Sequence, residues 1–151
     1  MIKFIVLLIL CFFDILSKYL VFNFIRLNDF VPLFYFVDLI HIHNYGVSFG
    51  LFSGLIPSWI LILLGSLIVF FIFYLMKNAK NNFEKWGFLI IISGAISNIF
   101  DRILNGYVID FIFLNYQKYY WPAFNFADIY ITIGILMLMS TIIIKFDRIK
   151  K

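Results

Sequence analysis

The apolar residues of this chain fall into long runs that are separated by more polar segments. A helix that crosses a bilayer needs about 20 mostly apolar residues. Four runs meet this length, at residues 4–25, 57–76, 86–104 and 123–144. Pro57 suits the first turn of the second helix, because an N–H at that position would have no helical partner. We therefore expect an all-α membrane protein with four transmembrane helices, in a single domain that covers residues 1–151.

The segment between the first and second runs, residues 27–56, is too long for a simple turn. Residues 34–43 are rich in Phe, Tyr, Val and Ile, and residues 40–43 alternate between apolar and polar side chains. Such alternation is typical of a strand that is half buried. We expect this segment to add a small extracytoplasmic β-rich element that rests on the outer leaflet.

Basic residues gather on one side of the predicted spans. They precede the first span, separate the second from the third, and follow the fourth, as Lys3; Lys77, Lys80 and Lys85; and Lys145, Arg148, Lys150 and Lys151. Short loops with excess Lys and Arg remain in the cytoplasm. Both termini are therefore expected to be cytoplasmic, in a multi-pass membrane protein.

Composition agrees with a membrane protein and argues against nucleic-acid binding and against a cysteine-based metal site. The chain is 64% hydrophobic and 13% charged, whereas soluble domains are about half apolar and about a quarter charged. The net charge of +4 comes from dispersed or helix-terminal residues, so it does not suggest a nucleic-acid partner. The partners expected are membrane lipids. The single Cys11 excludes an internal disulfide and a multi-Cys metal site.

The start of the chain could also be interpreted as a lipoprotein signal peptide ending before Cys11. Two features argue against this interpretation. Signal cleavage sites require small residues, whereas Leu10 is large, and the apolar run continues past Cys11 to Ile25. We therefore expect Cys11 to be a small hydrophobic residue that faces lipid or another helix.

Polar residues recur at helical spacing on three of the four spans. In each span they share one face, because residues three and four apart are neighbours on a helix. If both termini are cytoplasmic, these faces meet near the outer side of the membrane, and Asp110 follows the third span after a short turn. Ionisable residues inside a membrane are candidates for function. The residues are Asp14, Ser17 and Lys18; Gly94, Ser97, Asn98, Asp101 and Arg102; and Asn125, Asp128 and Thr132.

Each of these groups also has a purely structural interpretation. Asp14 and Lys18 could form a polar clamp between helices. Asp101 and Arg102 could form an ion pair at a helix end, and we favour a structural role for Asp101. Asp128 could cap the fourth helix or interact with its dipole.

Two histidines and an aromatic cluster complete the candidates. His41 and His43 lie on the predicted strand without a clear third ligand, and such residues are more often at the surface than on a metal. We expect no metal and no cofactor. The aromatic segment 118–121 is interpreted as an interfacial anchor.

A pair of carboxylates could by itself hydrolyse a peptide bond. No Ser–His pair is evident at the outer end, and Cys11 lies too far toward the cytoplasmic half. Two close carboxylates share a proton, so one can activate water while the other polarises the carbonyl and later protonates the amine. An ion or proton carrier, or an assembly subunit held by polar clamps, remains open on the same residues.

Four segments occur in an order that resembles a known family. They are FDILSKYL (13–20), HNYGVSFGLF (43–52), SGAISNIFDRILNGYVIDFI (93–112) and FNFADIYITIG (124–134). Together they resemble the lipoprotein signal peptidases, also called signal peptidase II, over nearly the whole chain. The resemblance implies an aspartic endopeptidase that cleaves diacylglyceryl-modified prolipoproteins just before the lipidated Cys. It further implies a location in the bacterial cytoplasmic (inner) membrane with the active site near the outer face, and it implies that inhibitors such as globomycin bind at the dyad. We expect the protein to be a monomer.

The resemblance also assigns roles to individual residues. The catalytic aspartates map to Asp110 and Asp128. Residues that bind substrate or support the dyad map to Asp14, Lys18, Asn44, Gly46, Asn98, Arg102 and Asn125. The sequence departs from the family pattern at Ser97, where Gly is common, at Val47-Ser48, and at Ile129-Tyr130. No carboxylate is lost, so the departures bear on helix spacing and inhibitor fit.

Overall fold

The computed structural model describes residues 1–47 and 50–149 of the chain, and it contains the four expected helices. Ser48, Lys150 and Lys151 lie outside the described residues. The helices are α1 (Ile2–Phe24), α2 (Ser58–Asn78), α3 (Asn82–Asn105) and α4 (Phe126–Ile149). All four have a segment long and apolar enough to cross a membrane. The main shift from the prediction is at α4, because Ala123 and Phe124 belong to a strand instead of the helix.

The sheet is larger than the sequence predicted. One strand was expected, whereas four form an antiparallel sheet in the order β1 (Phe30–Phe34), β2 (Val37–Asn44), β3 (Val108–Tyr116) and β4 (Tyr119–Phe124). Gly106 ends α3 with a φ of 82°, a left-handed conformation that glycine adopts readily. The chain thereby reverses after α3 and enters β3. The predicted aromatic anchor, residues 118–121, forms the β3–β4 turn and the start of β4.

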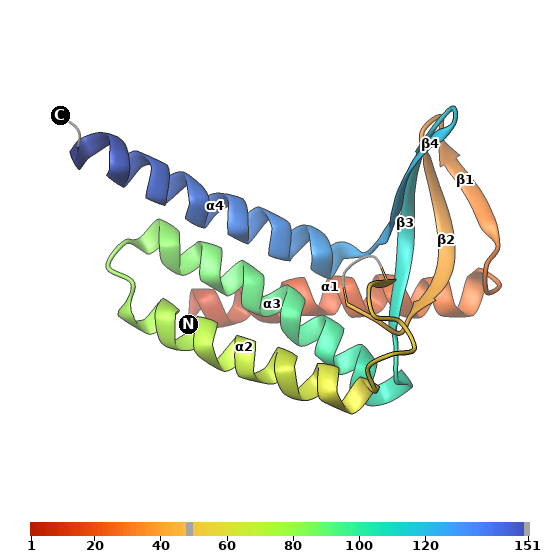
Figure 1. Cartoon of the computed structure of the whole chain (residues 1–151), viewed down its shortest axis with the longest axis horizontal. Helices are drawn as coiled ribbons and strands as arrows, with labels where there is room; N and C mark the ends of the chain where they lie inside the picture. Colours follow the sequence, from red (N-terminus) through yellow and green to blue (C-terminus); the bar gives the residue numbers. More distant parts are fainter. Residues whose placement is uncertain (48–49, 150–151) are drawn as a thin grey trace.

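The elements are arranged so that both termini lie at one end and the sheet at the other (Figure 1). The α2–α3 turn shares the end with the termini, as the distribution of basic residues predicted. The sheet rises away from the bundle and forms a V with α4 (Figure 1). β3 joins the sheet to the bundle, since Ile109 and Phe111 are buried with Val21 of α1.

α3 is the central helix, because it packs against α1, α2 and α4. Its contact with α4 depends on small residues that let the two backbones approach closely. A Cβ on Gly94 would lie 2.3 Å from the carbonyl oxygen of Ala127, and one on Gly134 would lie 2.6 Å from that of Gly87. On the α1 side, the Cys11 thiol donates to a carbonyl oxygen of α3 at 3.4 Å, so Cys11 is helix-facing as expected.

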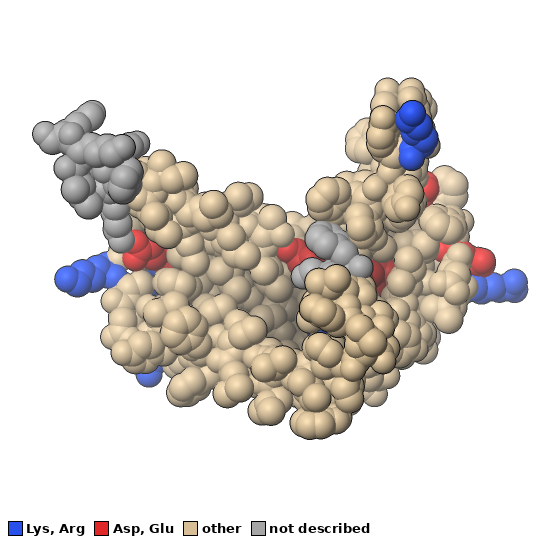
Figure 2. Space-filling view, viewed as in Figure 1, with Lys and Arg blue, Asp and Glu red and all other residues tan. Residues whose placement is uncertain are grey.

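The outer surface of the bundle is apolar. In the view of Figure 2, Lys and Arg lie toward the two ends of the molecule, and the surface between them is almost entirely uncharged. α2 is the most exposed helix, with Leu61 as its one buried residue. The bundle therefore presents an apolar surface to its surroundings, as a membrane-embedded domain does.

Candidate functional site

Asp110 lies on β3, among four consecutive buried residues. It pairs with Ile42 of β2, and the residue is 3% exposed. Asn44 of β2 donates to one carboxylate oxygen at 2.8 Å, and Asn125 donates to the other at 2.6 Å. Burial raises the pKa of Asp110 to about 7, and the charge of Asp128 adds to this rise, whereas the two hydrogen bonds lower it.

Asp128 is held by the first turn of α4. The Asn125 side chain accepts from the Asp128 backbone N–H at 3.0 Å, and Asp128 accepts from the Asn125 backbone N–H at 3.2 Å. This reciprocal arrangement is a capping box, which satisfies two N–H groups at the helix start. The interpretation that Asp128 helps to cap the fourth helix is therefore confirmed. Asn125 connects the two aspartates, because the same side chain also donates to Asp110.

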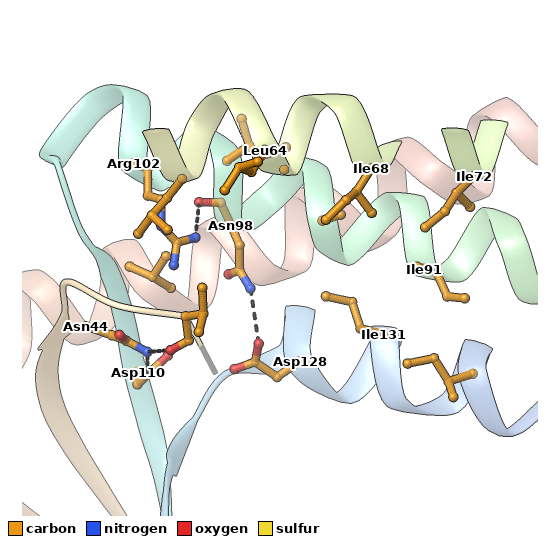
Figure 3. Close-up of a pocket in the computed structure, with 17 residues that line it drawn as sticks. Asn44, Leu64, Ile68, Ile72, Ile91, Asn98, Arg102, Asp110, Asp128 and Ile131 are labelled. Atoms are coloured by element: carbon orange, nitrogen blue, oxygen red, sulfur yellow. Dashed lines mark hydrogen bonds between the residues drawn. The ribbon is translucent and has the colours of Figure 1, made fainter. Parts of the chain in front are cut away.

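The two carboxylates line one cavity of about 440 Å³, which Figure 3 shows. Asp110 reaches it from the sheet, and Asp128 from the first turn of α4. From there the cavity continues between α2 and α4 over the apolar side chains of α3. The polar groups thus stand at one end of an apolar groove. Its walls include Leu64 and Ile68 of α2, Ala95 and Ile99 of α3, and Ile131 of α4.

Lys18 anchors the polar residues of α1 to those of α3. Its ammonium lies 2.7 Å from Asp14 and 2.9 Å from Asp101, and it donates to the Asn98 side-chain oxygen at 2.8 Å. Asn98 in turn donates to Asp128 at 3.1 Å (Figure 3). The predicted clamp between Asp14 and Lys18 is therefore present, and Asn98 extends it to the carboxylate pair.

Asp14 and Asp101 also bind backbone groups outside their own helices. Asp14 accepts from the Ala127 backbone N–H at 2.7 Å and so ties α1 to the start of α4. Asp101 accepts from the Ile109 backbone N–H at 3.5 Å and so ties α3 to β3. The expected helix-end ion pair between Asp101 and Arg102 is wrong, because the Asp101 carboxylate pairs with Lys18 of α1 and Arg102 donates to backbone carbonyl oxygens instead. Asp101 thus holds Lys18 and β3 in place.

Arg102 and Asn44 hold the loop that follows β2 over the cavity. Arg102 donates to the Gly46 carbonyl oxygen at 2.6 Å, and the Asn44 side chain accepts from the Gly46 N–H at 2.9 Å. A Cβ on Gly46 would lie 2.2 Å from the Leu51 carbonyl oxygen. The loop needs glycine there because the backbone passes too closely for a side chain.

The prediction that the two histidines lie at the surface is wrong. His41 is buried and His43 is half-buried. The His41 Nδ1 donates to the Ile25 carbonyl oxygen at 2.8 Å, so its Nε2 accepts from His43 at 3.1 Å. His43 stacks on Tyr107, and burial lowers the pKa of His43. This pair joins β2 to the end of α1.

The sequence-predicted site residues thus converge, while the groove was missed. All nine residues assigned by resemblance take part in the connected polar network around Asp110 and Asp128. The groove residues of α2 and α4 were not predicted, because apolar side chains within an apolar span resemble lipid-facing ones. The departure at Ser97 is accommodated, since its hydroxyl donates to the Ser93 carbonyl oxygen within α3 at 3.1 Å.

Comparison with known proteins gives matches over most of the chain. Residues 6–144 match the family described as Signal peptidase (SPase) II. A lipoprotein signal peptidase from Wigglesworthia glossinidia brevipalpis is 40% identical over 129 residues, which cover 83% of this chain and 84% of that protein. Another, from Thermodesulfovibrio yellowstonii, is 38% identical over 124 residues, which cover 82% of each chain. A bacterial membrane enzyme solved by the in meso method is similar in structure, with a TM-score of 0.86 and 25% identity over 93% of this chain and 87% of that one.

Proposed function

The chain belongs to the signal peptidase II family, and from this premise we propose that it is an aspartic endopeptidase that removes signal peptides from prolipoproteins. Its substrates carry diacylglycerol on the lipobox Cys, and cleavage falls just before that residue. The observation that carries the proposal is the position of Asp110 and Asp128 on the wall of one cavity. Both carboxylates stand where an apolar groove ends, so a chain lying in the groove would reach them.

The groove suits the signal peptide of such a substrate. A signal peptide contains an apolar segment, and the groove offers apolar side chains from α2, α3 and α4 along its length. With the termini on the cytoplasmic side, the sheet and the carboxylates lie near the outer face, where a diacylglyceryl group anchors the Cys in the outer leaflet. The scissile bond is thereby brought to the depth of the two aspartates.

Peptide hydrolysis at this pair needs neither a metal nor a covalent intermediate. The ionised member of the pair takes a proton from water as the water oxygen attacks the carbonyl carbon. The protonated member donates to the carbonyl oxygen, and a proton then passes to the leaving amine as the C–N bond breaks. Arg102 can orient the substrate backbone, because it lines the cavity that contains both aspartates.

Cleavage of a defined substrate tests this proposal. The purified protein is mixed in lipid with a diacylglyceryl-modified prolipoprotein, and release of the signal peptide is followed for Asp110→Asn and Asp128→Asn. Either change should abolish cleavage while the protein still folds, and a chelator should have no effect. Asp38→Asn is a matched control, since Asp38 is a carboxylate of the same sheet that is bonded to the Asn115 amide.

Two outcomes would contradict the proposal. Cleavage that persists in Asp110→Asn would refute the dyad. Proton flux into liposomes in the absence of any prolipoprotein would favour the carrier that the sequence left open.

A further inference from the structure

The ammonium of Lys18 determines which way the Asn98 side chain faces. A lysine ammonium has three donors and no acceptor. All three donors are used, by Asp14, Asp101 and the Asn98 side-chain oxygen. Because the oxygen of Asn98 must face Lys18, its NH₂ group faces Asp128. The 1% exposure of Lys18 leaves water little access to compete for these contacts.

The two aspartates consequently have different surroundings. Asp128 accepts from an amide that is polarised by a buried cation, and hydrogen bonds in such a chain strengthen one another. It also lies in the first turn of α4, where the helix dipole favours a negative charge. Asp110 lies on a strand and accepts from Asn44 and Asn125. The other hydrogen bonds of these two amides go to backbone groups.

We propose that Lys18 is a positioning residue that acts through Asn98 to keep Asp128 ionised, so that Asp110 carries the proton in the resting enzyme. This inference rests on the proposed function. Asp128 is then the group that takes the proton from water, while Asp110 gives its proton to the carbonyl oxygen. As the C–N bond breaks, the amine receives the proton held by Asp128, and a hydroxyl of the tetrahedral intermediate returns one to Asp110.

Charged groups of α1 and α3 lie around the pair. Lys18 and Asp14 come from α1, Asp101 and Arg102 from α3, and the aspartates themselves from β3 and α4. Their combined field acts on both aspartates. The test therefore compares the two limbs of the pH profile of kcat/KM. The acid limb, at low pH, reports the ionisation of the base, which is Asp128 in this proposal. The base limb, at high pH, reports loss of the proton from the acid, which is Asp110.

The first test removes the amide and keeps the cation. Asn98→Leu has a similar volume, loses both hydrogen bonds and leaves Lys18 paired with Asp14 and Asp101. We expect the acid limb of the kcat/KM profile to move up by about one pH unit, with the base limb unchanged. Movement of the base limb instead would overturn the proposal, as would two unmoved limbs. Asn78→Leu, an exposed amide at the far end of α2, should leave both limbs unchanged.

The second test removes the cation together with its two counter-charges. In the triple variant Lys18→Met, Asp14→Asn, Asp101→Asn the Asn98 amide is released, and the side-chain oxygen at position 14 still accepts from the Ala127 backbone N–H. Repeating the three changes in the Asn98→Leu background separates the effect carried by the amide from the field of the charges. The three changes should move the acid limb further to higher pH in the wild-type background than in the Asn98→Leu background, because only the first shift includes loss of the hydrogen bond through the polarised amide. Equal shifts in the two backgrounds would overturn the role of Lys18.

A milder variant covers the case in which the triple variant does not fold, which thermal unfolding in detergent detects. Lys18→Gln combined with Asp14→Asn keeps a donor near Asn98 and leaves the net charge of the cluster unchanged, so the acid limb should move up by less than in Asn98→Leu. An unmoved acid limb in the folded double variant would overturn the proposal in the same way.

Failure of this inference can be told apart from failure of the proposed function. If Asp110→Asn or Asp128→Asn still cleaves the prolipoprotein, the dyad itself is wrong. If both abolish cleavage and the limbs of the Lys18 and Asn98 variants remain in place, the dyad stands and only the assignment of the proton is wrong.

Discussion

The close contact between α3 and α4 at Gly94 predicts a sharp effect of adding one methyl group. In Gly94→Ala the new Cβ would lie 2.3 Å from the Ala127 carbonyl oxygen, whereas ordinary contact begins at 3.4 Å. The helices must therefore separate by about 1 Å at the level of the α4 capping box. Overpacking of this kind costs about 1–3 kcal/mol. A shift of about 1 Å at the reacting groups can lower the rate by about 100-fold.

Two measurements on the same protein check this prediction. Thermal unfolding in detergent should show a lower midpoint for Gly94→Ala, and kcat/KM for prolipoprotein cleavage should fall by about 100-fold. Gly65→Ala is the matched control on α2. Its Cβ would meet the Ile99 side chain at 3.1 and 3.2 Å, and a side chain can rotate where a backbone carbonyl cannot. If Gly94→Ala behaves like Gly65→Ala in both assays, the close helix contact does not position Asp128 as argued.

Three further predictions concern the pH dependence, the loop and the groove. Because the proposed mechanism requires a protonated Asp110, kcat/KM should fall as the pH rises through about 7. Asn44→Leu should move this base limb to higher pH, since the ionised carboxylate loses a hydrogen-bond donor. An unmoved base limb in the Asn44→Leu protein would contradict this reasoning. Gly46→Ala should lower kcat/KM by about tenfold or more, because its Cβ would lie 2.2 Å from the Leu51 carbonyl oxygen. Wild-type kcat/KM in the Gly46→Ala protein would contradict the close approach of the two backbone segments. Ala95→Trp should fill the groove and raise KM by about tenfold with little change in kcat, since binding of the substrate is weakened equally in the ground state and the transition state. An unchanged KM in steady-state assays would mean that the signal peptide does not bind in this groove.

The helices could be predicted from the sequence because each is a long apolar run with a clear boundary. Of the four strands, β2 could be predicted from the alternation at residues 40–43, whereas β1, β3 and β4 could not, and β3 shows the reason. Its residues 108–116 include a run of large apolar side chains without the alternation that identifies a half-buried strand. Residues 108–111 are buried on both faces, by α1 on one side and around the cavity on the other. That environment exists only in the folded chain.

The polar residues of the candidate site could be predicted, whereas the contacts between them, and the apolar groove, could not. Helical spacing placed Asp14 with Lys18, and the order of motifs assigned the aspartates. The contact from Asn98 to Asp128 joins residues 30 positions apart, and that from Lys18 to Asn98 joins residues 80 apart. Sequence spacing carries no information about such contacts. The burial of His41 was missed for the same reason, because its partner is the end of α1.

The position of the two carboxylates on different elements has a consequence for biosynthesis. Asp110 is fixed by the ladder between β2 and β3, and Asp128 by the capping box of α4, the last helix of the described chain. The pair therefore comes into existence only after that span has been inserted and has docked on α3. A chain whose synthesis has not yet reached α4 already contains β2 and β3 but lacks Asp128. If Asp110 and Asp128 are the catalytic pair proposed above, the site is complete only once α4 has docked on α3.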